Sequence, residues 1–357
     1  MPCATEVDMV EVFRNHRRGA GLAALDTFPS DDATGVRDLL RECPAHLVTR
    51  LLDLTELAHE IGVASIVVKD ERSRMGLGSF KALGAAYAIA REASLARGKS
   101  DWATTLSGRV FVTASAGNHG LSVAAGARLF GARAVIYLSA SVPETFADRL
   151  RAKGAEVRRA GATYEESMAE AEAEAATERW TLLSDSSWPG YTEIPFRVME
   201  GYLQMAAEIV EQVKEVPTHV LLQAGVGGMA AAVAAHARKS WGGAPVIIVV
   251  EPDAAPALIE SVRAGKIVAT EGPVSAMGRL DCKTPSMIAL AGLARDADLF
   301  VTISEAEAES AVERLAAQGI ATTPSGAAGL AALISGLPDM TRTARVLAIL
   351  SEGSEVG

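Results

Sequence analysis

Apolar positions fall into short, continuous runs along most of the chain, and these runs are rich in β-branched residues. Runs of this kind are typical of strands that are buried on both faces of a parallel sheet. The strands predicted in this way cover residues 65–69, 109–114, 134–138, 155–159, 219–223, 246–251, 299–303 and 345–350.

Longer alanine-rich stretches follow most of these runs and predict helices. They cover residues 81–97, 118–130, 143–153, 164–179, 194–214, 227–240, 304–318 and 326–335. The segment 163–179 is dominated by Ala and Glu, which are strong helix formers, so it predicts a solvated helix rather than a disordered tract. Alternating strands and helices predict an α/β fold with parallel-rich sheets covered by helices.

The size of the chain favours two lobes over one. It has 357 residues, of which 49% are hydrophobic, which is ample for a large core. Gly, Ser and Thr cluster in 98–109, which predicts a connection between lobes, and a second break is expected at 184–190. We therefore expect a large domain formed by 1–97 and 187–357, with 98–186 as a smaller inserted domain.

Charge and composition exclude several classes of partner. The formal net charge of −10 argues against binding to nucleic acid or to an anionic membrane. The three cysteines are widely spaced, which indicates a reducing compartment and no zinc pattern. The N-terminus lacks the basic region of a signal peptide, and Gln223 and several glycines interrupt the most apolar region, 220–235. A soluble cytoplasmic protein is expected.

Lys81 stands at the end of KDERSRMGLGSFKALG (69–84), where a helix should begin. The positive end of a helix disfavours an ammonium group and favours a free amine, which Schiff-base chemistry needs. A solvated surface lysine is the alternative when this residue is considered alone.

The stretch TASAGNHG (113–120) lies between a predicted strand and a predicted helix. Small residues let backbone N–H groups approach a ligand closely. Ser115, Gly117, Asn118 and His119 could hold a carboxylate at the start of the helix. An ordinary capping loop is the alternative.

The stretch QAGVGGMAAAV (223–233) also joins a strand to a helix, and its glycines offer a nest of backbone N–H groups for a phosphate. It matches G-x-G-x-x-A through Gly225, Gly227 and Ala230, and Glu251 ends the next strand. That spacing is typical of dinucleotide binding, so a nicotinamide-dependent oxidoreductase remains an alternative.

These loops occur in a recognisable order, which ends with Ser351 after the last strand. The order of SFKALG, SAGNHG, a glycine-rich loop and a late serine resembles the pyridoxal-phosphate enzymes of the tryptophan-synthase β fold, or fold type II. The likeness runs from about residue 45 to the C-terminus. Within that fold the motifs are most similar to diaminopropionate ammonia-lyase, through VVKDERSRMGLGSFKALGAAYA (67–88), DSSWPGYTEIP (185–195), PTHVLLQAGVGGMA (217–230), VVEPDAA (249–255) and SEG (351–353).

The resemblance implies pyridoxal 5′-phosphate as cofactor, with Lys81 as its Schiff-base lysine and as the group that moves the α-proton. Asn118 would contact the 3′ oxygen of the cofactor, and Ser351 would face its pyridine nitrogen. The residues implied for the phosphate are Gly225, Val226, Gly227, Gly228 and Met229. Those implied for the substrate carboxylate are Ser115, Gly117 and His119. Asp185 and Tyr164 match catalytic-site residues of the ammonia-lyase.

The expected activity is α,β-elimination on a small β-substituted L-amino acid such as 2,3-diaminopropionate, which releases a 2-oxo acid and ammonia. A homodimer is expected by analogy with the fold. A serine/threonine-type dehydratase, a β-replacement synthase and a cofactor-free relative remain alternatives. The chain also departs from the ammonia-lyase pattern, because Ala116 stands where that pattern has an aspartate expected to act as base toward the D-isomer.

Overall fold

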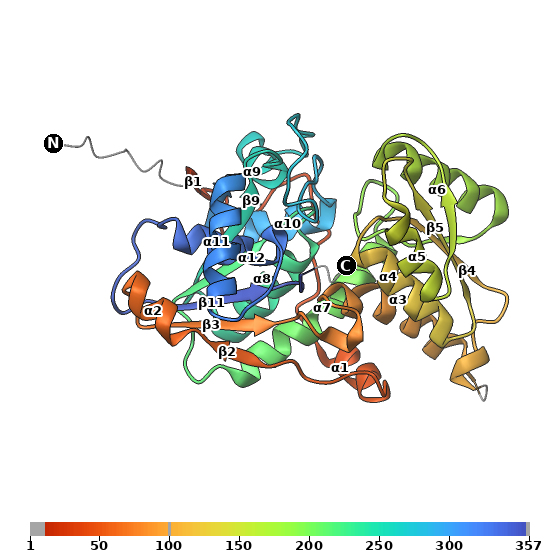
Figure 1. Cartoon of the computed structure of the whole chain (residues 1–357), viewed down its shortest axis with the longest axis horizontal. Coiled ribbons are helices and arrows are strands. Elements are labelled where there is room, and N and C mark those ends of the chain that lie inside the picture. Colours follow the sequence, from red (N-terminus) through yellow and green to blue (C-terminus); the bar gives the residue numbers. More distant parts are fainter. Residues whose placement is uncertain (1–10, 99–100, 355–357) are drawn as a thin grey trace.

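The computed structural model describes residues 11–98 and 101–354. Their strands form one seven-stranded and one four-stranded sheet, which lie in two separate bodies of the molecule (Figure 1). Helices cover both sheets, so the predicted two-lobed α/β class is confirmed. Lys99 and Ser100, within the predicted connection at 98–109, lie outside the described residues.

The interior strands of the larger sheet pair in parallel, as the continuous apolar runs predicted. Its two edge strands, β1 and β2, pair antiparallel with their neighbours. In spatial order the strands are β1 (Glu11–Arg14), β10 (Leu299–Ile303), β9 (Val246–Pro252), β8 (His219–Gln223), β11 (Arg345–Leu350), β3 (Ser65–Asp70) and β2 (Leu51–Asp53).

The smaller sheet is parallel throughout. In spatial order its strands are β6 (Glu156–Arg159), β5 (Arg133–Leu138), β4 (Val110–Ala114) and β7 (Thr181–Leu182). All four fall inside the segment expected to form an inserted domain, while the boundaries at 98 and 186 stay a prediction.

All eight predicted helices are present, with ends within two residues of those expected. They are α3 (Lys81–Ala96), α4 (Asn118–Leu129), α5 (Glu144–Ala152), α6 (Tyr164–Glu178), α7 (Glu193–Gln212), α8 (Gly228–Trp241), α11 (Glu305–Ala317) and α12 (Pro324–Ile334). The elements not predicted are β1, β2, β7, α1 (Thr34–Arg41), α2 (Thr55–Ile61), α9 (Ala257–Ala264), α10 (Met287–Asp296) and the 3₁₀ turns η1 (Arg74–Gly76) and η2 (Trp102–Thr104).

Helix α3 joins the two bodies, because it packs against α4 on one side and against α7 on the other. One apolar cluster accordingly contains Leu83 of α3, Leu121 of α4 and Val198 of α7. Lys81 is the first residue of α3, so it begins the helix that packs against both bodies.

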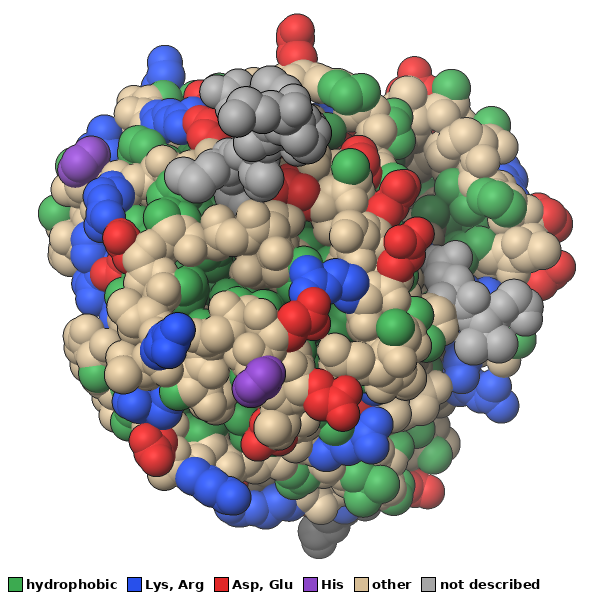
Figure 2. Space-filling model, turned by 60° about the vertical axis from the view of Figure 1, so that its left-hand side comes forward, with side chains coloured by type: hydrophobic (Ala, Val, Ile, Leu, Met, Phe, Trp, Pro, Cys, Tyr) green, Lys and Arg blue, Asp and Glu red, His purple; other side chains and the backbone are tan. Residues whose placement is uncertain are grey.

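The surface shows no segregation of charge on the face seen in Figure 2, where acidic and basic side chains are interspersed. Within the part of the chain that the structure describes, every helix is too short or too polar to cross a bilayer.

Candidate active site

Lys81 and Asp185 form an ion pair, with the Lys81 Nζ donating to Asp185 Oδ2. Lys81 begins α3, and Asp185 follows the short strand β7 of the smaller sheet. The Phe80 N–H donates to the Ser351 carbonyl at 3.0 Å, which places the end of β11 directly beside the start of α3. The two charged side chains remain 21% and 17% exposed, so a small molecule can reach them.

The charge state of Lys81 differs from the expectation. Burial alone would lower the pKa of the amine, but the Asp185 carboxylate outweighs it and raises the pKa above its ordinary value. Burial likewise favours a raised pKa for Asp185, and the Lys81 charge reverses this, so the carboxyl pKa lies below its usual range. The prediction of a free amine was wrong for this state, because a direct ion pair outweighs a helix end.

The glycine-rich loop after β8 has the backbone of an anion site. Gly227 has a φ of +94° and occupies the N-cap of α8, and no side chain caps this helix. The N–H groups of the first turn are therefore open to an anion. A Cβ on Gly225 would lie 2.9 Å from Cys282 Sγ, so the loop needs glycine there.

Cys282 is a site residue that the sequence did not reveal, since an isolated cysteine carries no signal. Its thiol packs against Gly225. Burial, followed by the nearby Asp185 charge, raises its pKa to about 12. The thiol is therefore neutral and lies close to both the glycine loop and the ion pair. Because it is not ionised, it does not react as a thiolate.

Ser115 organises the loop between β4 and α4. Its Oγ accepts hydrogen bonds from the N–H groups of Gly117 (3.2 Å) and Gly120 (3.1 Å). The hydroxyl proton remains for another acceptor. This geometry suits the predicted carboxylate site at the start of α4.

Asn118 donates from Nδ2 to Glu352 Oε2, and Glu352 also accepts from Thr323 Oγ1 at 2.5 Å. Arg279 lies 3.8 Å from Glu352, and its Nη1 donates to the Ala116 carbonyl at 3.2 Å. Sequence reasoning missed both Glu352 and Arg279. Together they connect the loop after β4 to the larger sheet.

His119 and Tyr164 lie at the same site in different ways. His119 is buried, its Nε2 is 2.9 Å from the Leu183 carbonyl, and burial lowers its pKa, so the ring is neutral. It supports the segment that leads to Asp185. Tyr164 is half exposed at the start of α6, while burial of its hydroxyl and the Asp185 charge raise its pKa, which keeps it a neutral phenol.

Glu251, the acidic residue of the dinucleotide interpretation, has a different role. Its two carboxylate oxygens accept the N–H groups of Leu258 and Ile259, each at 2.8 Å, at the start of α9. The side chain is fully buried, and burial raises its pKa to about 8. Because it caps a helix, it is not available to a ribose, which argues against a nicotinamide-dependent oxidoreductase.

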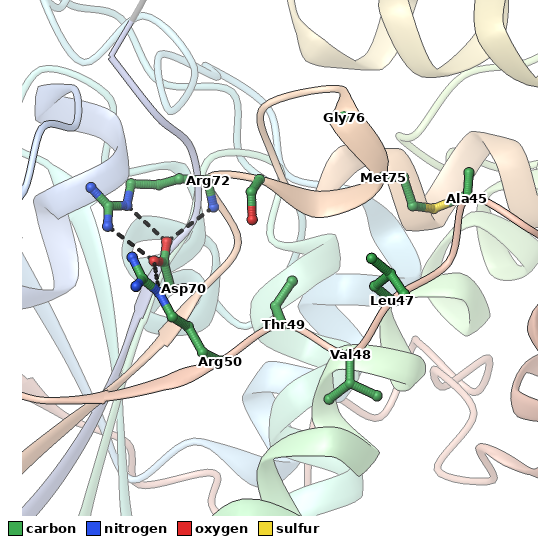
Figure 3. A pocket seen from close by; sticks show the side chains of 10 residues that line it. Ala45, Leu47, Val48, Thr49, Arg50, Asp70, Arg72, Met75 and Gly76 are labelled. Carbon is green, nitrogen blue, oxygen red and sulfur yellow. Dashed lines mark hydrogen bonds and ion pairs between the residues drawn. The ribbon is translucent and has the colours of Figure 1, made fainter.

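A separate surface pocket of about 570 Å³ lies beside the segments 45–50 and 70–76 (Figure 3). Arg50 and Arg72 converge there on Asp70, at 3.0 and 2.7 Å. Lys81 and the loops described above do not line it.

The residues at Lys81 fit pyridoxal phosphate. The site combines the Lys81 amine with the uncapped start of α8, which suits a phosphate, and with the loop after β4, which suits a carboxylate. Among the buried polar atoms of the described residues that lack a well-aligned hydrogen-bond partner, three belong to residues around Lys81: Ser79 Oγ, His119 Nδ1 and Tyr202 Oη. Such atoms indicate a polar ligand or a changing partner.

Comparison with known proteins agrees with this geometry. Residues 43–352 match the profile of the family described as "Pyridoxal-phosphate dependent enzyme". The chain belongs to this family. The fold type II architecture and the cofactor expected from the motifs are thereby confirmed.

Two proteins show the similarity in detail. The diaminopropionate ammonia-lyase of Salmonella typhimurium is 36% identical over 265 residues, which are 70% of this chain and 65% of that protein. The crystal structure of the Escherichia coli diaminopropionate ammonia-lyase with an aminoacrylate–PLP azomethine reaction intermediate has a TM-score of 0.86 and 31% identity, over 96% of this chain and 94% of that one. The same enzyme in complex with D-serine has a TM-score of 0.87, with 30% identity over the same shares. The similarity to the ammonia-lyase that the motifs indicated is confirmed.

Proposed function

We propose that this chain is an ammonia-lyase that removes the β-substituent of a small L-amino acid such as 2,3-diaminopropionate. With water, this substrate would give one 2-oxo acid and two molecules of ammonia. The observation that carries the proposal is the Lys81–Asp185 pair beside an uncapped, glycine-rich helix start. The similarity to two diaminopropionate ammonia-lyases supports it.

When bound, pyridoxal phosphate supplies the electron sink that makes removal of the α-proton possible. Lys81 would hold it covalently, and the backbone of Gly225–Met229 would hold its phosphate. Ser351 would face the pyridine nitrogen with a neutral hydroxyl. Asn118 would contact the 3′ oxygen after exchanging its bond to Glu352.

The protein's own groups would position the substrate and move its protons. Ser115 and Gly117 would bind the carboxylate at the start of α4, and Lys81 would take the α-proton. Asp185 holds the Lys81 ammonium until a ligand competes for it. Because Asp185 is ionised in this state, it can protonate a leaving group only after receiving a proton from Lys81. The neutral phenol of Tyr164 is the other available donor.

A panel of β-substituted amino acids tests the proposal through release of 2-oxo acid. We expect the highest kcat/KM with L-2,3-diaminopropionate. A higher value with L-serine or L-threonine would instead assign a dehydratase. Turnover of O-acetyl-L-serine only when a thiol or sulfide is added would assign a replacement synthase.

We also propose that the active form is a homodimer, which sedimentation of the holoenzyme would test. A mass of one chain, 37.2 kDa, under conditions of full activity would contradict this.

A further inference from the structure

Tyr202 is a buried tyrosine of α7 that the proposed reaction has not yet used. Its side chain is 1% exposed, and its hydroxyl has no well-aligned hydrogen-bond partner among the described residues. A buried hydroxyl without a partner is unfavourable by ~1–3 kcal/mol, which a purely structural residue such as Phe would avoid.

Close packing against α3 places this hydroxyl near Lys81. A Cβ on Gly84 would lie 2.6 Å from Tyr202 Cε1 and 2.8 Å from both Cζ and the hydroxyl oxygen. Only glycine permits this approach, and Gly84 lies one helical turn after Lys81. The Phe80 ring contacts the Tyr202 ring edge-on, with centroids 5.0 Å apart, and Lys81 Nζ lies 5.3 Å from the centre of the same Phe80 ring.

Asp185 alone is an incomplete partner for a lysine that must change its protonation state. An ionised carboxylate only accepts hydrogen bonds, so it stabilises the ammonium and offers nothing to the lone pair of the neutral amine. A phenol both accepts and donates, so it can bind either form. Proton transfer by Lys81 requires both forms in turn.

We propose that Tyr202 is a positioning residue for Lys81, whose hydroxyl holds the ε-amine in place through its charged and neutral forms. This inference deepens the proposed function and rests on it for the role of Lys81. The state of the phenol agrees with it. Burial raises the pKa of Tyr202 to about 12 although the Lys81 charge opposes this, so the group remains neutral at working pH.

The test is Tyr202→Phe, which removes the hydroxyl and keeps the ring contacts with Phe80 and Gly84. The matched control is Tyr87→Phe, the same change at a buried tyrosine of α3 whose hydroxyl neighbours Glu200, Arg91 and Arg197. Circular dichroism and urea unfolding check that both variants fold.

The first measurement needs no bound cofactor. The full-length chain, stripped of cofactor, is reductively methylated at pH 9, and the rate at Lys81 is followed by mass spectrometry. The phenol binds the ammonium more strongly than the neutral amine, because a charge-assisted hydrogen bond is the stronger of the two. Its loss therefore lowers the amine pKa by about one unit, which corresponds to ~1.4 kcal/mol, so Tyr202→Phe should react about tenfold faster than the parent. Tyr87→Phe should react at the parental rate.

The second measurement uses the holoenzyme. In Tyr202→Phe we expect kcat on the best substrate to fall about 10- to 100-fold with KM unchanged, since a misplaced base affects proton transfer rather than binding. Gly84→Ala, which displaces the ring but keeps the hydroxyl, should increase Lys81 methylation in the same direction.

Equal methylation rates at Lys81 in the parent and in folded Tyr202→Phe would overturn the proposal. Failure of the ammonia-lyase assignment has a different signature. In that case the panel of substrates yields no 2-oxo acid, while the change in Lys81 methylation still supports the contact with Tyr202.

Discussion

Lys69 and Lys81 are both lysines paired with carboxylates inside the protein, yet their surroundings differ. Lys69 Nζ is completely buried, contacts Glu208 Oε2 at 2.6 Å, and donates to the Thr49 carbonyl at 2.7 Å and to Gln212 Oε1 at 2.8 Å. These three acceptors use all three of its protons.

Lys69 and Glu208 belong to a buried cluster with Arg74 and Glu71. The hydrogen-bond donors of Arg74 are fully used as well. All five N–H groups of Arg74 are donated, to Glu71, Glu208, the Leu47 carbonyl and Thr49. Two cations face two carboxylates, so the cluster is neutral. It adjoins the pocket of Figure 3, because Thr49 lines that pocket and also bonds to Glu71, Arg74 and Lys69. Through Arg74 and Glu208 the cluster connects η1 to α7, ahead of the helix that begins at Lys81.

Lys81, by contrast, has one well-aligned acceptor among the described residues, and its side chain is partly exposed. The pKa shifts run opposite to a simple expectation. Burial lowers the pKa of Lys69 despite Glu208, whereas Asp185 raises that of Lys81 despite burial. A perturbed pKa therefore does not distinguish the proposed catalytic lysine, Lys81, from Lys69, whereas unfilled hydrogen-bonding capacity and access to solvent do.

The largest expected effect is that of Lys81→Ala. Loss of the covalent attachment and of the proton-transfer group should reduce 2-oxo acid formation by at least about 10⁴-fold. The free energy of unfolding should change by less than about 1.5 kcal/mol, because the partly exposed Asp185 can be hydrated. Activity and urea unfolding measure the two effects, and borohydride fixation of cofactor to the variant would contradict the assignment.

For Lys69→Met we expect a large loss of stability and little loss of activity. Removing one cation from a buried cluster should lower the free energy of unfolding by about 3 kcal/mol, near the low end for such changes because Arg74 still faces Glu208. The folded variant should keep kcat within about threefold of the parent. The control is Lys239→Met at an exposed pair with Asp31, worth at most about 1 kcal/mol. If kcat of the folded Lys69→Met variant fell well beyond threefold, Lys69 would instead belong to the catalytic machinery.

The difference between the two lysines is where prediction from sequence reached its limit. The motif SFKALG identified Lys81, and the spacing of loops after strands predicted which segments meet. The ion pair with Asp185 joins residues 104 positions apart, and the Asn118–Glu352 contact joins residues 234 apart. Pairings of this range depend on tertiary packing, so the charge of the Lys81 amine could not be predicted.

Local pattern explains the remaining successes and failures. Long buried strands and alanine-rich helices carry strong periodicity, and they were predicted to within two residues at helix ends. The strands that were missed, β7, β2 and β1, have two to four residues and present no continuous run of apolar side chains long enough to stand out; β6, also four residues long, is the one short strand that was predicted. Tyr202 lies inside a predicted helix, where the sequence predicts that an aromatic residue packs in the core. Its position at the site is revealed by the contact with Gly84.

Asp185→Asn tests the carboxylate that pairs with Lys81. The amide keeps the shape but neither carries the charge nor transfers a proton, so kcat should fall about 100-fold while cofactor remains attached. The pKa of Lys81 should move down toward that of an unpaired buried lysine, which makes the amine more reactive toward reductive methylation at pH 9. A rate equal to that of the parent on its best substrate would reduce Asp185 to a structural residue of the turn after β7.

The smallest effect concerns the face of the substrate that Lys81 does not reach. A base on one side of the bound substrate can take the α-proton of one enantiomer only, and Ala116 has no proton acceptor to offer the other. The parent should therefore prefer L-substrates, with D-2,3-diaminopropionate at least about 100-fold poorer in kcat/KM. Ala116→Asp should raise turnover of the D-isomer by only about tenfold, because Arg279 at the residue-116 carbonyl would stabilise the new carboxylate and weaken it as a base. Ala116→Asn is the matched control without a base, and comparable kcat/KM of the parent on both enantiomers would show that another residue serves the second face.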